Sequence, residues 1–167
     1  MNLAVVVLAA GMGKRMRSEV PKVLHPVLGR PMLSYVLDAV ESLSPKKTVL
    51  VVGHGSENVK QISDSKKIIY AAQDKQLGTG HAANCASSAL KNFKGDILIL
   101  NGDYPLITSA ALKKFLSGHV KNKADLSILT ALVDDPTGYG RIKRDEKNQV
   151  IGIVEEKDAS RDEKFID

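Results

Sequence analysis

The chain has 167 residues, 43% of them hydrophobic and 26% charged, and carries a formal net charge of +5. These values are typical of one soluble globular domain with a packed core, and the single cysteine, Cys85, excludes an internal disulfide and suits a reducing compartment. Four tyrosines, three phenylalanines and no tryptophan argue against binding single-stranded nucleic acid by stacking. The N-terminal apolar run has no basic segment before it, and no stretch approaches the roughly 18 apolar residues of a membrane helix. We therefore expect a cytoplasmic protein that binds neither nucleic acid nor membranes.

Apolar, β-branched runs alternate with helical patterns along the chain. In chain order the patterns predict a strand at 3–10, a helix at 31–43, strands at 48–55 and 67–72, a helix at 82–90, a strand at 96–103, a helix after the N-cap Thr108, and a strand at 126–133. A hairpin with its turn at 145–148 follows. This alternation predicts a single α/β domain over residues 1–167, with a Rossmann-like, mixed but mostly parallel sheet between two layers of helices.

The loop after the first strand joins two glycines to several cations. Gly11 and Gly13 can adopt positive φ and let backbone N–H groups approach a ligand closely. The same stretch carries four cations, Lys14, Arg15, Arg17 and Lys22. Ligands of open α/β sheets bind beyond the carboxyl ends of the strands, so the loop predicts a phosphate site. A tight structural turn is the alternative for the glycine pair alone.

Other known phosphate-binding patterns do not fit this loop. The spacing is not that of a Walker A sequence, and Met16 occupies the place of the third glycine in a dinucleotide fingerprint. Asp103 follows an apolar strand at the same sheet edge, where a carboxylate suits Mg²⁺; its alternative role is to cap the turn before Pro105. The four histidines lack metal-ligand spacing, so we expect structural or solvent-facing roles for them.

Four stretches together resemble one enzyme family. They are "LAAGMGKRMRSEVPKVLHPVLGRPM", "AAQDKQLGTGHA", "NGDYPLI" and "DDPTGYGRI" with the later "VEEKDA". In this order they resemble the sugar-nucleotide pyrophosphorylases, and specifically the uridylyltransferase domain of the bacterial bifunctional N-acetylglucosamine-1-phosphate uridylyltransferase/glucosamine-1-phosphate acetyltransferase. The resemblance implies a cytoplasmic, Mg²⁺-dependent nucleotidyltransferase that converts UTP and N-acetylglucosamine-1-phosphate into UDP-N-acetylglucosamine, a peptidoglycan and lipopolysaccharide precursor, and pyrophosphate.

The resemblance also implies roles for residues at matching positions. The uridine and its phosphates would be bordered by Leu8, Ala9, Ala10 and Gly11. Catalytic contacts to the triphosphate and Mg²⁺ would come from Arg15, Lys22 and Asp103, with Asp103 as metal ligand. The uracil edge would be read by Gln73, Gly78 and Thr79. Asn101 and Gly102 would lie near the ribose, and Gly140 and Glu155 would contact the N-acetylglucosamine moiety.

The chain departs from the family pattern in two respects. Lys14 replaces a small hydroxyl residue, and the sequence lacks the E-x-N-x-G segment, the asparagine that shares the metal, and the left-handed β-helix acetyltransferase domain. We therefore expect an incomplete nucleotidyltransferase domain, monomeric and weakly active alone, whereas the full-length family forms homotrimers. Two alternatives are a nucleotidyltransferase for another sugar or polyol phosphate, and a nucleotide-binding fragment without turnover.

Overall fold

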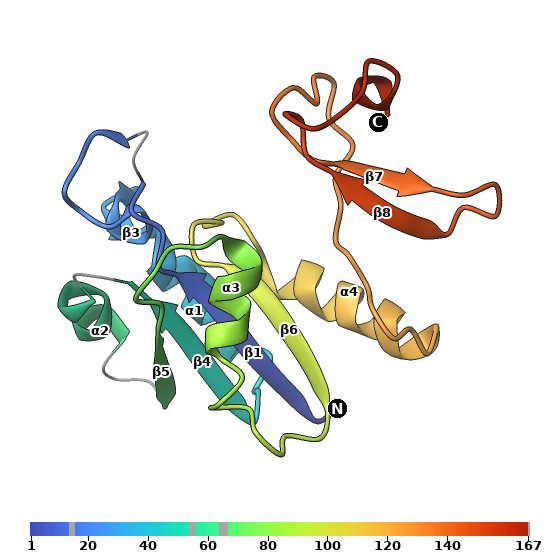
Figure 1. Ribbon diagram of the computed structural model, residues 1–167. Coiled ribbons are helices and arrows are strands. Elements are labelled where there is room, and N and C mark those ends of the chain that lie inside the picture. Colours follow the sequence, from blue (N-terminus) through green and yellow to red (C-terminus); the bar gives the residue numbers. More distant parts are fainter. Residues whose placement is uncertain (14–15, 54–55, 64–66, 167) are drawn as a thin grey trace. The chain divides into compact units, whose positions relative to one another are not determined.

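The computed structural model describes residues 1–13, 16–53, 56–63 and 67–166, and it divides into two compact units, Met1–Lys123 and Ala124–Asp167. The first unit contains a four-stranded sheet in the order β5-β4-β1-β6 (Figure 1). Its strands are β1 (Leu3–Ala9), β4 (Lys47–Val52), β5 (Ile68–Ala72) and β6 (Asp96–Asn101). All neighbouring strands are parallel, so their carboxyl ends share one edge.

Helices cover both faces of this sheet. They are α1 (Met32–Glu41), α2 (Glu57–Ser63), α3 (Thr79–Cys85) and α4 (Ser109–Lys121). On one face Val5, Val7 and Leu50 pack with the buried side chains of α1, α2 and α4. On the other face, Ala82 of α3 packs with Val6 of the sheet. The central strands β1 and β4 are apolar on both sides because both sides are covered, whereas Ile97 and Ile99 of the edge strand β6 are about half exposed. The predicted three-layer α/β fold is confirmed for this unit.

A short segment connects β1 to α1. It contains the 3-10 helix η2 (Lys22–Leu24) and the two-stranded pair β2 (Pro26–Val27) and β3 (Arg30–Pro31). The turn between β2 and β3 places Leu28 and Gly29 at positive φ. Within η2, Val23 is buried in the core beneath the loop. This anchoring fixes where the side chain of the preceding Lys22 leaves the backbone.

The sequence predicted most elements of the first unit within a few residues. Thr108 caps α4 as predicted, since its hydroxyl accepts a hydrogen bond from the Ala111 amide, and Leu112 and Leu116 of this helix are buried. The helix expected at 82–90 is misplaced: α3 begins three residues earlier, at Thr79, and ends at Cys85. Beyond Cys85 the chain forms turns instead. Among helices in the described residues, none combines the length and apolar character needed to span a membrane.

The second unit is built on the predicted hairpin, β7 (Arg141–Arg144) and β8 (Val150–Val154), and ends with the 3-10 helix η3 (Glu163–Phe165). The Arg141 guanidinium is buried and donates to Glu156 at 2.8 Å. Lys143 donates to Glu163 at 2.6 Å, and this contact, with hydrogen bonds from Ser160, lowers the pKa of Glu163 to about 2. These polar contacts join η3 and the segment after β8 to the hairpin.

The strand predicted at 126–133 is wrong. These residues form no regular element in the structure, and Leu126, Leu129 and Leu132 are 77%, 55% and 86% exposed. A strand needs a neighbour for its N–H and C=O groups, and no described segment pairs with this run. Apolar, β-branched character alone is therefore not enough to make it a strand. Whether both units form one domain, as the sequence predicts, stays a prediction.

Candidate functional site

The loop that follows β1 is shaped by close contact with η2. Gly13 has φ of +60°, and a Cβ atom placed on it would lie 2.9 Å from Cβ of Lys22. Gly13 therefore meets both conditions that require glycine, positive φ and close approach. Gly11 differs from the expectation, because its φ is not in the positive region and a Cβ atom there would meet open space. The loop thus packs on Lys22 at Gly13 and is open at Gly11.

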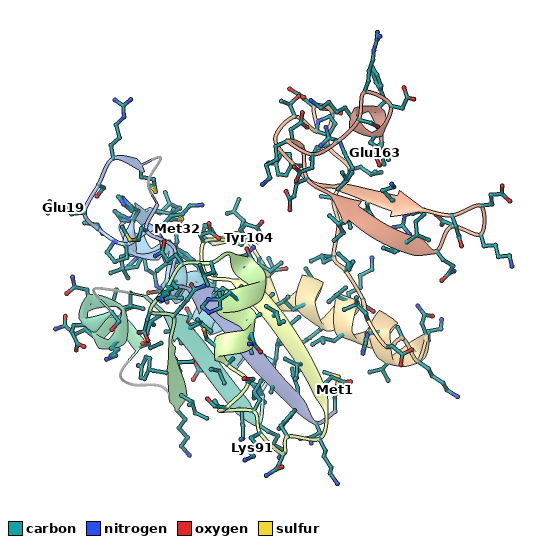
Figure 2. The ribbon with its side chains drawn as sticks, viewed as in Figure 1. Met1, Glu19, Met32, Lys91, Tyr104 and Glu163 are labelled. Atoms are coloured by element: carbon teal, nitrogen blue, oxygen red, sulfur yellow. The ribbon has the colours of Figure 1, made fainter. Side chains whose placement is uncertain are left out.

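An ion pair joins the loop region to the end of β6. The Nζ atom of Lys22 donates a hydrogen bond to Oδ2 of Asp103, although the two residues are 81 positions apart. The Lys22 side chain is 37% exposed and that of Asp103 is 19% exposed, so the pair is accessible at its lysine end. Figure 2 shows Tyr104, the residue after Asp103, at the same end of the sheet as Met32, and Met1 and Lys91 at the opposite end. The cation and the carboxylate predicted separately from the sequence are brought together.

The backbone holds Asp103 in place through its neighbours. Asn101 ends β6 opposite Leu8 of β1, and the Gly102 amide donates to the Leu8 carbonyl at 2.8 Å. A Cβ atom on Gly102 would lie 3.0 Å from that carbonyl oxygen and 3.3 Å from Leu33 of α1. The close packing explains the glycine, and it fixes the backbone just before Asp103.

A second segment reaches the same edge after β5. The backbone N–H group of Gln73 donates a hydrogen bond to the Val52 carbonyl at 2.8 Å. The residue is buried, with 5% of its surface exposed. Gly78, with φ of +102°, precedes Thr79 at the start of α3. The side chain of Gln76 donates to the Ala10 carbonyl at 2.7 Å, which ties this segment to the glycine loop. The sequence analysis missed Gln76, because a single amide contact across 66 residues leaves no local pattern.

Gly140 and Glu155 lie beside each other in the second unit. A Cβ atom on Gly140 would be 3.3 Å from Ile153 and 3.8 Å from Oε2 of Glu155. The neighbouring Glu156 forms ion pairs with Arg141 and Lys164. Although desolvation opposes ionisation, the hydrogen bond from Arg141 keeps the pKa of Glu156 below its usual range. Glu156 therefore has a structural role, whereas Glu155 is exposed.

Of the residues predicted to contact the triphosphate and the metal, the structure describes Lys22 and Asp103. Arg15 lies outside the described residues, as does Lys14. Within the described ranges no group of three or more histidine, cysteine or acidic side chains could hold a metal ion. The carboxylate of Asp103 fits Mg²⁺ as a single protein ligand, because this ion usually takes one or two carboxylates and completes its shell with phosphate oxygens and water.

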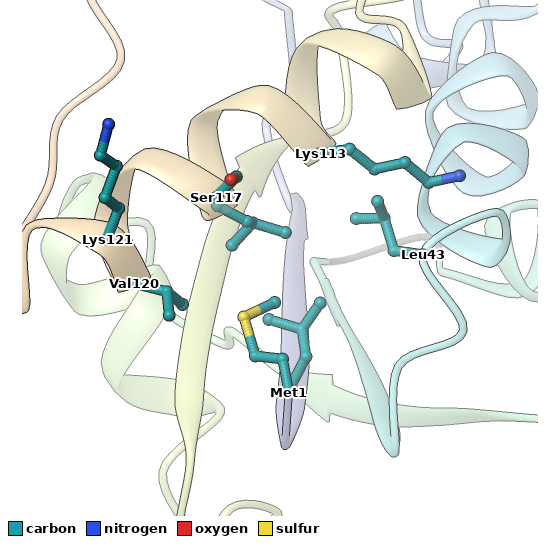
Figure 3. Close-up of a pocket in the computed structure, with 8 residues that line it drawn as sticks. Met1, Leu43, Lys113, Ser117, Val120 and Lys121 are labelled. Carbon is teal, nitrogen blue, oxygen red and sulfur yellow. The ribbon is translucent and has the colours of Figure 1, made fainter.

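A cavity of about 570 Å³ lies at the other end of the sheet. Figure 3 shows it between the last turns of α4 and the start of β1, and its walls include Leu3, Leu116 and Val120. Leu3 is the first residue of β1, whereas the glycine loop follows the last. The cavity is therefore separate from the edge that carries Lys22 and Asp103.

Comparisons with known proteins agree with this architecture. The MobA-like NTP transferase domain family matches residues 5–145. The bifunctional protein GlmU of Thermoanaerobacter pseudethanolicus is 49% identical over 165 residues, which make up 99% of this chain and 36% of that protein. The chain thus spans about a third of the length of the curated relatives it matches.

Two solved structures share the fold. HddC from Yersinia pseudotuberculosis, complexed with GMP-PN, has a TM-score of 0.72 and 25% identity, and the match covers 91% of this chain and 68% of HddC. A UDP-glucose pyrophosphorylase complexed with UDP-glucose has a TM-score of 0.71 at 18% identity, over 93% of this chain and 69% of that one. Since the family match covers most of the sequence and the parallel sheet is that of solved sugar nucleotidyltransferases, the chain belongs to the MobA-like NTP transferase domain family.

Proposed function

We propose that this chain carries the nucleotide site of a uridylyltransferase that forms UDP-N-acetylglucosamine and pyrophosphate from UTP and N-acetylglucosamine-1-phosphate. The observation that carries the proposal is the contact between Lys22 and Asp103 beside the Gly13 turn. It places a cation and a carboxylate at the carboxyl edge of a parallel sheet, where α/β proteins bind nucleotides. Similarity to bifunctional GlmU proteins supports the uridine substrate and the sugar.

The reaction joins two anions, so its barrier is largely electrostatic. An oxygen of the sugar 1-phosphate attacks the α-phosphorus of UTP, a new P–O bond forms, and the bond to the β-phosphate oxygen breaks to release pyrophosphate. The attacking oxygen is already ionised near neutral pH, so no general base is required. Lys22, and Arg15 by resemblance, would bind the triphosphate and stabilise the charge that builds on the leaving pyrophosphate.

Asp103 would hold Mg²⁺ through its carboxylate. The ion, when bound, neutralises phosphate charge and helps orient the triphosphate. Because Oδ2 of Asp103 accepts from Lys22, the other carboxylate oxygen is the one that we assign to the metal. Lys22 then has two tasks: it orients Asp103 and it contacts phosphate.

The uridine would lie along the carboxyl edge. Leu8, Ala9, Ala10 and Gly11 would border it, and the open space above Gly11 supports a close approach of the nucleotide there. We assign the uracil edge to Gln73, Gly78 and Thr79, and the ribose to Asn101 and Gly102. In the second unit, the exposed Glu155 beside Gly140 would bind the sugar. The cytoplasmic location and the assembly state stay predictions.

A pyrophosphate-release assay tests the proposal. UTP, CTP, GTP and dTTP are each combined with N-acetylglucosamine-1-phosphate, glucose-1-phosphate or methylerythritol phosphate, using this chain and a longer protein that includes the E-x-N-x-G segment. We expect the longer protein to turn over UTP with N-acetylglucosamine-1-phosphate fastest, and the 167-residue chain to be much slower. Preference for another pair would contradict the assigned substrates. Equal rates would show that the E-x-N-x-G segment matters less than the resemblance implies.

A further inference from the structure

The buried amide of Gln73 has an orientation that its neighbours determine. Its Nε2 atom lies 3.2 Å from the carbonyl oxygen of Gly78 and 3.0 Å from Nδ1 of His81, the third residue of α3. A carbonyl oxygen can only accept hydrogen bonds, so the nitrogen of the Gln73 amide, and not its oxygen, must face Gly78. One of the two amide hydrogens is used in this contact.

The second amide hydrogen fixes the state of His81. Since Nε2 of Gln73 is a donor, Nδ1 of His81 must accept, and an accepting Nδ1 carries no proton. The imidazole is therefore neutral, with its proton on Nε2. Both hydrogens of the Gln73 amide are then occupied by Gly78 and His81, and no hydrogen bond within the described chain uses its oxygen.

The side-chain oxygen of Gln73 is therefore the group that is available to accept a hydrogen bond from a base. Uracil presents a donor at N3, which an amide oxygen can accept, whereas cytosine presents an unprotonated, accepting N3 at the same place. An amide turned the other way would present its nitrogen and favour cytosine. We propose that His81 is a positioning residue for nucleotide selection: by accepting from Gln73 it holds the amide oxygen toward the base, and so favours uridine over cytidine nucleotides. This inference rests on the assignment of Gln73 to the uracil edge.

Two substitutions of His81 separate its hydrogen bond from its bulk. His81→Asn can place an amide oxygen where Nδ1 lies, and so keeps the acceptor. His81→Leu removes the acceptor, and leaves a buried donor of Gln73 without a partner. For the leucine variant we expect the ratio of CTP to UTP dissociation constants, measured by calorimetry with Mg²⁺, to fall at least about tenfold. The asparagine variant should keep the ratio of the unmodified chain, and thermal unfolding should show that both variants fold.

The tautomer provides a readout without nucleotide. In the unmodified chain with ¹⁵N-labelled histidine, NMR should place the proton of neutral His81 on Nε2, and Gln73→Leu should change the Nδ1 signal. A proton on Nδ1 would overturn the inference, as would a leucine variant that discriminates as well as the unmodified chain. If the folded, unmodified chain binds neither nucleotide, the proposed function fails and nucleotide selection by His81 fails with it. Tight UTP binding with a selectivity unaffected by His81→Leu would remove the positioning role alone.

Discussion

Alanine at position 22 should lower the rate of uridylyl transfer at least about a hundredfold. Lys22 is the described cation of the glycine loop region that contacts Asp103, and its ammonium would stabilise the charge on the departing pyrophosphate. A preorganised donor of this kind typically contributes about 2.7–4 kcal/mol to transition-state stabilisation, which corresponds to 10²–10³ in rate. We expect a similar loss for Asp103→Ala, because that variant removes the proposed metal ligand. The measurement is kcat/KM for UTP in the longer protein that carries this sequence.

Lys91→Ala is the matched control for the charge. Lys91 is an exposed lysine near the opposite end of the sheet (Figure 2), so its removal should leave kcat/KM unchanged. Lys22→Arg keeps a positive charge but alters the geometry of the contact with Asp103, and we expect it to be less impaired than Lys22→Ala. Near-normal turnover by Lys22→Ala, in a protein that unfolds at the usual temperature, would exclude Lys22 from the mechanism.

Replacing either loop glycine by alanine should weaken UTP binding, but for a different physical reason at each position. At Gly13 the new Cβ would collide with Cβ of Lys22, and φ of +60° adds strain of about 1–3 kcal/mol. Gly13→Ala should therefore lower thermal stability and weaken UTP binding together, since Lys22 must move. At Gly11 the new Cβ meets only open space in the free protein. Gly11→Ala should leave thermal stability unchanged and weaken UTP binding at least about tenfold, because the methyl group takes the place of the nucleotide.

Thermal unfolding and nucleotide calorimetry on the same samples check this pair. Gly118→Ala is a suitable control, because Gly118 lies within α4 and a Cβ atom there has no close neighbour. Alanine in a helix interior should raise stability slightly and leave nucleotide binding unaffected. Full UTP affinity in Gly11→Ala would contradict the proposed approach of the nucleotide to this residue.

The sequence predicted those helices and strands in which enough residues are buried to give a recognisable apolar pattern. Val5 and Val7 of β1 are buried against one helical layer and Val6 against the other, which explains why the strand is apolar without alternation. Helix α2, which the sequence analysis missed, has seven residues and buries Val59 and Ser63, too little for a helical period to be recognised. The run 126–133 has the composition of a strand, but a strand depends on a neighbour that composition does not specify.

The sequence identified several single residues of the site, but it did not predict which of them contact one another. Charge and position drew attention to Lys22 and Asp103, whereas their ion pair depends on the parallel register of β1 and β6. Gln73 was identified only by resemblance, since one buried amide has no pattern of its own. The contacts of Gln76 with Ala10 and of His81 with Gln73 depend on side-chain geometry across loops. For the same reason, we expected a structural or solvent-facing role for His81.

Isothermal titration of the folded 167-residue chain with UTP and Mg²⁺ tests the central claim most directly. We predict saturable binding of one UTP, with weaker binding in Lys22→Ala and in Gly11→Ala. Such a result would locate the nucleotide at the glycine loop even if the chain alone turns over slowly. A folded sample that binds neither UTP nor UDP-N-acetylglucosamine would contradict the claim that this sheet edge holds a uridine nucleotide.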